Sequence, residues 1–142
     1  MSCVDAFTNY VTFVPIPNKE ATTVVDAFFR KLICVHGAPQ ILLSDRGSEF
    51  TAGTFEALMD EYNVEHRTTG PYSLSTNGQC ERAHRRLNAI LKTCVSLWNE
   101  EWDQCLEQAA FSYNVTPLTD FPYPPTSCYT SFTRDSLRTS SV

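Results

Sequence analysis

Residues 10–43 read YVTFVPIPNKEATTVVDAFFRKLICVHGAPQILL, and this stretch combines three apolar patterns. Residues 10–16 are apolar and β-branched and run into two prolines, which predicts a strand that reaches the end of a sheet. Residues 18–35 predict a helix that a following glycine and proline bring to a close. Residues 41–43 are a continuous apolar run, as expected of a strand covered on both faces. The apolar face of the helix consists of Val25, Phe28, Phe29 and Leu32.

This strand–helix–strand order predicts parallel strands and an α/β domain. The chain has 142 residues. That length fits one domain, which would bury roughly two-thirds of the surface of its unfolded chain.

The rest of the chain continues the alternation. A helix is expected from about Thr51, a short strand over residues 64–68, and a loop rich in Gly, Pro, Ser and Asn over 69–78. A long helix should begin at residues 75–77 and end near Trp98, and a further helix should hold Trp102, Leu106, Ala109, Ala110 and Tyr113. We therefore divide the chain into a core, residues 1–115, and an extension, residues 116–142, which is expected to be largely irregular.

Composition narrows the class of protein. Hydrophobic residues make up 42% and charged residues 19% of the chain, as in a soluble globular protein. No apolar run is long enough to span a membrane, and the first residues do not form a secretory signal. The six cysteines lack CxxC spacing, which favours reduced thiols and an intracellular location, although a disulfide stays possible.

Charge is distributed unevenly. The formal net charge is −5, yet residues 66–92 contain five Arg or Lys side chains and one acid, a net charge of +4. A basic segment of this kind suits a phosphate backbone, and the alternative is a solvated helix face that binds nothing.

Two acidic residues stand in unusual strings. Asp45 lies in Leu-Ser-Asp-Arg-Gly-Ser-Glu-Phe, directly after the apolar run 41–43, and Glu81 follows 36 positions later in Thr-Asn-Gly-Gln-Cys-Glu-Arg. A carboxylate after a strand and another at the start of a helix can meet at one divalent metal ion, which prefers oxygen ligands. Taken singly, Asp45 would be an ordinary turn residue and Glu81 a response to the helix dipole.

These strings identify a family. Together they resemble the integrase catalytic core of long-terminal-repeat retrotransposons and retroviruses, most closely the Ty3/gypsy-like group, over roughly residues 3–135. The segments that carry the resemblance are 5–10 (DAFTNY), 36–39 (HGAP), 43–50 (LSDRGSEF), 71–72 (PY), 76–79 (TNGQ), 81–82 (ER), Trp102 and 111–114 (FSYN).

The resemblance implies a ribonuclease H-like mixed sheet flanked by helices. It also implies three carboxylates that hold two Mg²⁺ or Mn²⁺ ions, with Asp45 as the second ligand and Glu81 as the third. Two such ions activate an attacking hydroxyl and stabilise the leaving oxygen. The implied activity is DNA integration, by processing of DNA 3′ ends and strand transfer. Another ribonuclease H-like enzyme, such as a nuclease, is disfavoured by the string around Glu81.

DNA is the implied partner, with dimers or tetramers by resemblance, no membrane and a nuclear location. The residues implied to face DNA are Tyr72, Asn77 and Gln79 on the loop before Glu81, and Arg82, Arg85 and Lys92 on the helix. The alternatives are that Asn77-Gly78 is only a loop and helix cap, and that Arg85 merely faces solvent. Leu74 replaces a proline that is common in relatives, which should loosen the loop.

The first of the three carboxylates has no match. Asp5 is tempting, but its string follows the second strand in the family, so we expect a turn residue and a sheet that lacks the first strand. The 142 residues alone should then be catalytically inactive and only marginally folded. A non-catalytic remnant that binds DNA or protein is the competing function. His36 is expected to be structural, the role of His84 is open, and no histidine has cysteine partners for a zinc site.

Overall fold

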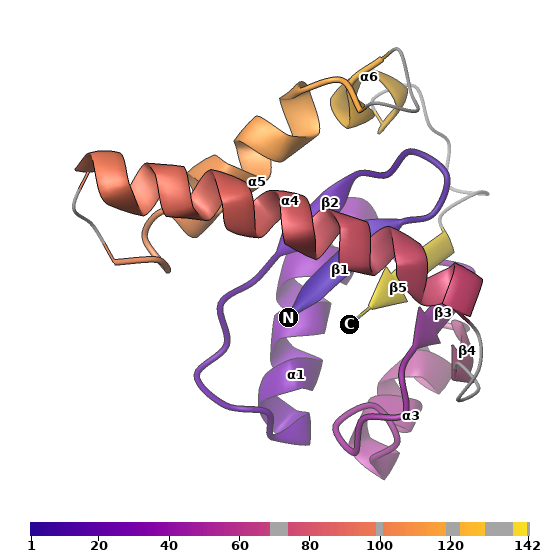
Figure 1. Ribbon diagram of the computed structural model, residues 1–142. Coiled ribbons are helices and arrows are strands. Elements are labelled where there is room, and N and C mark those ends of the chain that lie inside the picture. The colour runs from indigo at the N-terminus through magenta and orange to yellow at the C-terminus, as the bar shows by residue number, and fades with distance from the viewer. Residues whose placement is uncertain (69–73, 99–100, 119–122, 130–137, 142) are drawn as a thin grey trace.

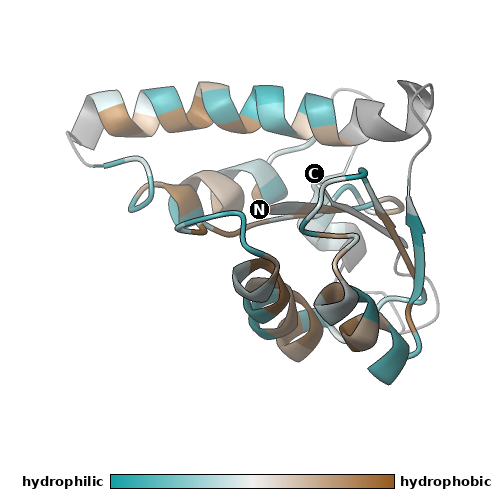
Figure 2. Ribbon diagram, turned by 90° about the horizontal axis from the view of Figure 1, so that it is seen from below, coloured by the Kyte–Doolittle hydropathy of each residue, from teal (hydrophilic) through white to brown (hydrophobic). Residues whose placement is uncertain are grey.

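The structure is a computed structural model that describes residues 1–68, 74–98, 101–118, 123–129 and 138–141. Side chains are described for residues 1–68, 80–96, 101–118 and 123–127. The described residues form a mixed α/β domain in which helices cover both faces of one sheet (Figures 1 and 2).

The sheet has five strands in the order β2-β1-β5-β3-β4. Strands β1 and β2 form an antiparallel hairpin, and β3 and β4 pair in parallel. The strands are β1 (Ser2–Asp5), β2 (Val11–Phe13), β3 (Ile41–Ser44), β4 (Glu65–Thr68) and β5 (Arg138–Ser141). β2 and β3 run in the same direction, as the strand–helix–strand pattern predicted, but two other strands lie between them.

The helical connection between β2 and β3 is continuous and changes its winding once. It consists of α1 (Ala21–Phe28), a π-helical turn η1 (Phe29–Ile33) and α2 (Cys34–His36). Gly37 ends it with a φ of 88°, a backbone conformation that glycine adopts without steric cost. The helix and its glycine end were therefore predicted correctly.

The remaining helices agree with the expected positions, with one exception. They are α3 (Gly53–Glu61), α4 (Leu74–Trp98), α5 (Leu106–Val115) and α6 (Pro125–Tyr129). We had expected Trp102 to belong to α5, but that helix begins four residues after it. The Trp102 side chain is 57% exposed, so it does not gain the burial against the core that would stabilise a longer helix.

Two apolar cores lie on opposite faces of the sheet. One packs α1 and α3 against the sheet through Phe28 and Phe55, and the other packs α4 and α5 through Leu87 and Ala109. Neighbouring β1 residues alternate between the cores, Cys3 facing the first and Val4 the second. Alternation fixes the register of β1, because a shift by one residue would exchange the two faces.

Strand β5 occupies the centre of the sheet. It pairs antiparallel with β1 and parallel with β3, so it supplies hydrogen-bond partners to both. The expectation that residues 116–142 are largely irregular is wrong for α6 and β5. Sequence analysis predicted a sheet that lacks its first strand. In the structure β5 pairs with both β1 and β3, so the backbone groups that these two strands present to each other find partners.

Candidate active site

Asp45 follows the last residue of β3 and begins a tight turn. Its Oδ1 accepts a hydrogen bond of 3.0 Å from the Gly47 backbone N–H. The side chain is half-buried, and within the described ranges no Arg or Lys forms an ion pair with it. Asp45 therefore presents a carboxylate whose orientation is set by the backbone rather than by a basic side chain.

Glu49 lies beside Asp45. A Cβ added to Gly47 would stand 2.8 Å from Glu49 Oε2 and 3.0 Å from Asp45 Oδ1, so both carboxylates lie against this glycine. Sequence reasoning missed Glu49. The signal was that the two acids are four positions apart with a glycine midway, which allows both side chains to turn back onto one point.

Glu81 lies on α4 and is exposed. One helical turn further, His84 Nε2 lies 2.7 Å from Ser2 Oγ on β1. α4 packs over β1 and β5, and its N-terminal end extends toward the side of the sheet where β3 lies (Figure 1). β1 runs antiparallel to β5, and β5 runs parallel to β3. Ser2, at the start of β1, therefore lies at the same end of the strands as Asp45, which follows β3. Glu81 precedes this anchor in α4, on the part of the helix that extends toward the side of β3 (Figure 1).

Carboxylate oxygens are the ligands that a hard divalent cation prefers. Asp45 and Glu49 offer carboxylate oxygens from the turn after β3, and Glu81 offers them from α4. Among the side chains that are described, no group of three His, Cys, Asp or Glu residues stands close enough to hold a metal.

Asp5 is the last residue of β1, and its side chain holds the turn that follows, in agreement with the predicted turn role. Its Oδ1 accepts hydrogen bonds from the backbone N–H of Phe7 at 2.8 Å and of Thr8 at 3.4 Å. Asp5 lies level with Leu42, at the end of the sheet opposite to Asp45. It is three residues along the strands and two strands across from Asp45, roughly 10 Å in each direction.

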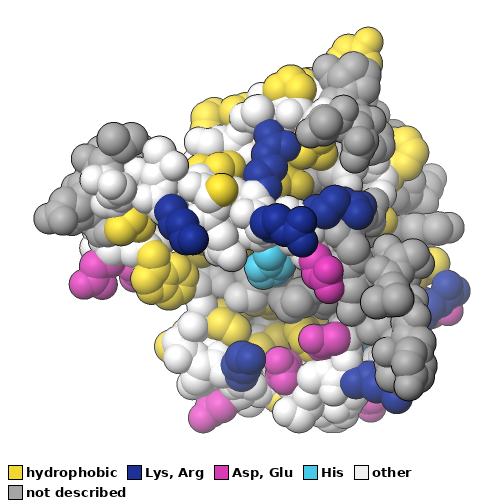
Figure 3. Space-filling view, viewed as in Figure 1, with side chains coloured by type: hydrophobic (Ala, Val, Ile, Leu, Met, Phe, Trp, Pro, Cys, Tyr) yellow, Lys and Arg dark blue, Asp and Glu magenta, His cyan; other side chains and the backbone are white. Residues whose placement is uncertain are grey.

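The basic side chains of α4 divide into two groups. Arg82, Arg85 and Lys92 are exposed, in agreement with the predicted position outside the apolar stripe. Lys and Arg side chains gather along α4 in Figure 3, and acidic side chains gather below it, over the turn between β3 and α3. Arg86 instead packs against α5 and the segment that follows it. Its guanidinium lies 5.2 Å from the centre of the Tyr113 ring and donates to the Pro117 carbonyl.

The loop expected before Glu81 is shorter than predicted. α4 begins at Leu74, so Asn77 and Gln79 belong to the helix and not to a loop, and that expectation was wrong. Extending an existing helix needs no new nucleus, which outweighs the weak helix propensity of Ser, Thr, Asn and Gly. The side chains of Asn77 and Gln79 and all of Tyr72 lie outside the described residues.

Each histidine has a hydroxyl partner. His84 contacts Ser2, His66 Nε2 lies 2.8 Å from Ser44 Oγ, and His36 Nε2 lies 3.4 Å from Thr12 Oγ1. Burial lowers the pKa of all three imidazoles. His36 is structural, as expected, and His84 joins α4 to β1.

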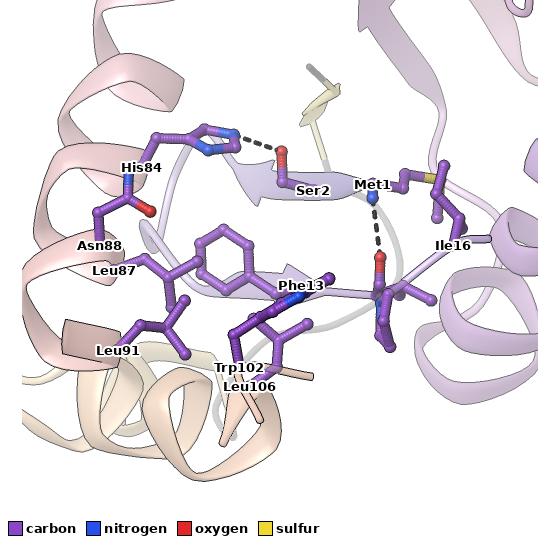
Figure 4. Close-up of a pocket in the computed structure, with 12 residues that line it drawn as sticks. Met1, Ser2, Phe13, Ile16, His84, Leu87, Asn88, Leu91, Trp102 and Leu106 are labelled. Atoms are coloured by element: carbon purple, nitrogen blue, oxygen red, sulfur yellow. Dashed lines mark hydrogen bonds between the residues drawn. The ribbon is translucent and has the colours of Figure 1, made fainter. Parts of the chain in front are cut away.

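A cavity of about 260 Å³ lies beside the Ser2–His84 hydrogen bond, and both residues line it (Figure 4). Its walls come from β1, β2, α4 and the segment before α5, and they are mainly apolar. Sequence reasoning did not predict this cavity, because its lining residues are distant in the chain.

Comparison with known proteins agrees with this architecture. A family model described as integrase core domain matches residues 1–74, more than half of the chain. The chain belongs to the integrase core domain family. It is 29% identical over 118 residues to the retrovirus-related Pol polyprotein from transposon 412 of Drosophila melanogaster, and 27% identical over 115 residues to the Gag-Pol polyprotein of walleye dermal sarcoma virus. The matches cover 83% and 80% of this chain, but only 10% and 7% of those polyproteins.

Solved integrase structures share the fold. The catalytic core domain of BIV integrase is 27% identical, with a TM-score of 0.77, and the match covers 90% of this chain and 82% of that one. The catalytic core domain of HTLV-2 integrase, solved in complex with magnesium, has a TM-score of 0.78 at 18% identity and the same coverage. The integrase core has the predicted ribonuclease H-like fold. Across its described residues, it contains no helix long and apolar enough to cross a membrane.

Proposed function

We propose that this chain is part of the catalytic core of an integrase that processes DNA 3′ ends and carries out strand transfer with divalent metal ions, and that DNA is its partner. Asp45 and Glu81 are the catalytic and metal-binding carboxylates, with Mg²⁺ or Mn²⁺ as the ion. Membership of the integrase core family carries the proposal. The N-terminal end of α4, which lies toward the side of the sheet that holds β3 (Figure 1), supports it.

The residues of the chain have separable roles. Asp45, held by the Gly47 N–H, and Glu81, on the exposed face of α4, supply oxygens for the ion. When bound, such an ion acts as a Lewis acid and makes bound water or hydroxyl a better nucleophile. Arg82, Arg85 and Lys92 offer positive charge beside this point, where a phosphate backbone would approach.

Metal binding tests the site directly. Mn²⁺ binding to the 142-residue chain should be measured by electron paramagnetic resonance for wild type, Asp45→Asn and Glu81→Gln. Both substitutions keep shape and remove one charged ligand, so each should weaken binding at least about tenfold. Equal Mn²⁺ binding by wild type and both variants would contradict the proposed site.

A non-catalytic DNA- or protein-binding function is the competing proposal. The exposed Arg82 and Arg85 favour it, because they need no metal ion to bind phosphate. We expect the isolated chain to lack joining activity, since the resemblance implies a third carboxylate beyond Asp45 and Glu81. Mg²⁺-dependent joining of donor-end DNA by this chain, abolished in Asp45→Asn, would reject both the competing function and the expected inactivity. Salt-dependent DNA binding without joining or Mn²⁺ binding would favour the competing function.

A nuclear location and self-association complete the proposal. A nuclear location follows from the proposed DNA substrate. The HTLV-2 core domain has been solved in trimeric and dimeric forms, which supports self-association of the present chain. Sedimentation of the purified chain over a concentration series tests self-association.

A further inference from the structure

The residue before Asp45 makes two hydrogen bonds that join Asp45 to the neighbouring strand. Ser44 is 1% exposed. Its Oγ donates to the Asp45 carbonyl oxygen at 2.8 Å, and the same Oγ lies 2.8 Å from His66 Nε2. His66 comes from β4, where it is paired in register with Leu42, two residues before Ser44. Both side chains therefore point to the same face of the sheet.

The network defines the state of the imidazole. A serine hydroxyl has one proton, and Ser44 uses it toward the Asp45 carbonyl. His66 must then donate through Nε2–H, which assigns the tautomer from the hydrogen-bond network. The His66 ring packs edge-on against Phe55, with 5.4 Å between ring centres, and Phe55 is fully buried. The donor is thus held in place by the core beneath it.

Asp45 is consequently fixed at two points. Its carbonyl is held by the Ser44 hydroxyl, and its carboxylate Oδ1 is held by the Gly47 N–H. Without the His66 donor, the Ser44 hydroxyl could rotate to other partners, and the peptide after Asp45 would lose one constraint. The direction of the carboxylate would become less defined.

We propose that His66 is a positioning residue that orients the carboxylate of Asp45 through Ser44. The metal consequence of this inference rests on the proposed function, whereas the orientation of Asp45 does not. Groups that orient a metal ligand typically change metal affinity by about 10–100-fold when they are removed.

Variants of His66 separate the hydrogen bond from packing. His66→Phe keeps a ring against Phe55 but removes the donor, and His66→Gln keeps an N–H donor near the position of Nε2 but removes the ring. Ser44→Ala removes the intermediate group. His36→Phe is the matched control, because His36 also bonds a hydroxyl but lies near Asp5, at the opposite end of the sheet.

Two measurements test the proposal. Hydrogen exchange of the Gly47 amide, followed by NMR, reports whether Asp45 Oδ1 still protects it. Exchange should accelerate about tenfold or more in His66→Phe and Ser44→Ala, recover in His66→Gln and stay unchanged in His36→Phe. Mn²⁺ affinity should follow the same order. The double variant Ser44→Ala/His66→Phe should bind Mn²⁺ no more weakly than either single variant, because both changes break the same chain of hydrogen bonds.

The outcomes distinguish the two proposals. Folded His66→Phe with unchanged Gly47 exchange and unchanged Mn²⁺ affinity would overturn the positioning role, even if Asp45→Asn abolished Mn²⁺ binding. If wild type bound no Mn²⁺, the proposed function would fail, and Gly47 exchange alone would decide the role of His66. If His66→Phe did not fold, Ser44→Ala and His66→Gln would decide the role of His66. Gly47 exchange at the wild-type rate in Ser44→Ala, or faster than the wild-type rate in His66→Gln, would overturn the positioning role.

Discussion

Ser2 and His84 are 82 positions apart in the chain and meet at 2.7 Å, between a serine Oγ on β1 and an imidazole Nε2 on α4. The His84 ring also packs edge-on against Phe13 on β2, with 5.9 Å between ring centres. This contact fixes the height of α4 above the sheet, one turn away from Glu81. The position of a proposed catalytic residue therefore depends on a contact formed by its helical neighbour.

Replacing His84 by leucine should loosen this anchor. His84→Leu retains apolar contact with Phe13 but removes one hydrogen bond to the buried Ser2 hydroxyl, which should cost about 0.5–1.5 kcal/mol of stability. Mn²⁺ affinity should also fall, because Glu81 loses its fixed height. Urea unfolding and Mn²⁺ titration measure the two effects. Asn88→Ala, an exposed change one turn further along α4, should alter neither, and an unchanged His84→Leu would refute the anchor.

Gly47 tests the turn that carries Asp45. In Gly47→Ala the new Cβ would meet Glu49 Oε2 at 2.8 Å and Asp45 Oδ1 at 3.0 Å, so the Asp45 carboxylate must move. We expect Mn²⁺ affinity to fall about tenfold, which is about 1.4 kcal/mol. Gly53→Ala is the control, because nothing lies within 4 Å of its Cβ and alanine suits the first turn of α3. Equal Mn²⁺ affinity in both variants would show that the turn adapts without cost.

The exposed arginines of α4 should bind phosphate. Replacing Arg82 and Arg85 by alanine should weaken binding to duplex DNA, and the slope of log K against log salt should become shallower by about 1 for each phosphate that is no longer neutralised. Fluorescence anisotropy over a salt series measures both quantities. Arg30→Ala is the control, because Arg30 does not lie on α4 and forms an ion pair with Asp26, one turn before it in its own helical segment. A salt slope equally shallow in Arg30→Ala would mean that binding follows overall charge and not this face.

Local patterns predicted most of the fold. The helix over 21–36, strand β3 and helix α3 follow from apolar periodicity and from Gly37 and Pro39, which act within a few residues. The exposed positions of Glu81, Arg82 and Arg85 follow from the same periodicity. The predicted turn role of Asp5 depended on the resemblance, and its hydrogen bonds confirm that role.

Contacts between distant residues could not be predicted in this way. The pairing of His84 with Ser2, and of His66 with Ser44, depends on how α4 and β4 lie against other strands, which no local pattern encodes. The centre of the sheet was the largest surprise. Arg138–Ser141 is polar, unlike a typical central strand, and its place is decided by the backbone partners that β1 and β3 offer.

The central strand can be tested by one residue. Ser140 pairs with Val4 and with Leu43, so Ser140→Pro removes a backbone donor within the sheet. The acceptor left without a partner should destabilise the chain by about 1–3 kcal/mol. Ser140→Val is the control with the opposite sign, because a β-branched apolar residue suits a strand between two neighbours. Urea unfolding measures both. If proline were tolerated without loss of stability, β5 would not contribute to the sheet in solution.

The histidines predict how stability depends on pH. Burial lowers the pKa of His36, His66 and His84 from the ordinary value of 6.5. The nearby charges of Asp5 and Glu56 oppose this shift for His36 and His66, and the N-terminal amine adds to it for His84. The unfolded chain then binds protons more readily than the folded chain.

Stability from these three groups is consequently complete above about pH 6.5 and is lost as pH falls through about 6.5 toward the lower folded pKa values. We expect the urea midpoint to fall between about pH 7.5 and about pH 5.5. His36→Phe removes one of the three titrating groups and should make this decline less steep. A midpoint that stays constant or rises as pH falls over this range would show that the imidazoles take up protons equally well in the folded chain.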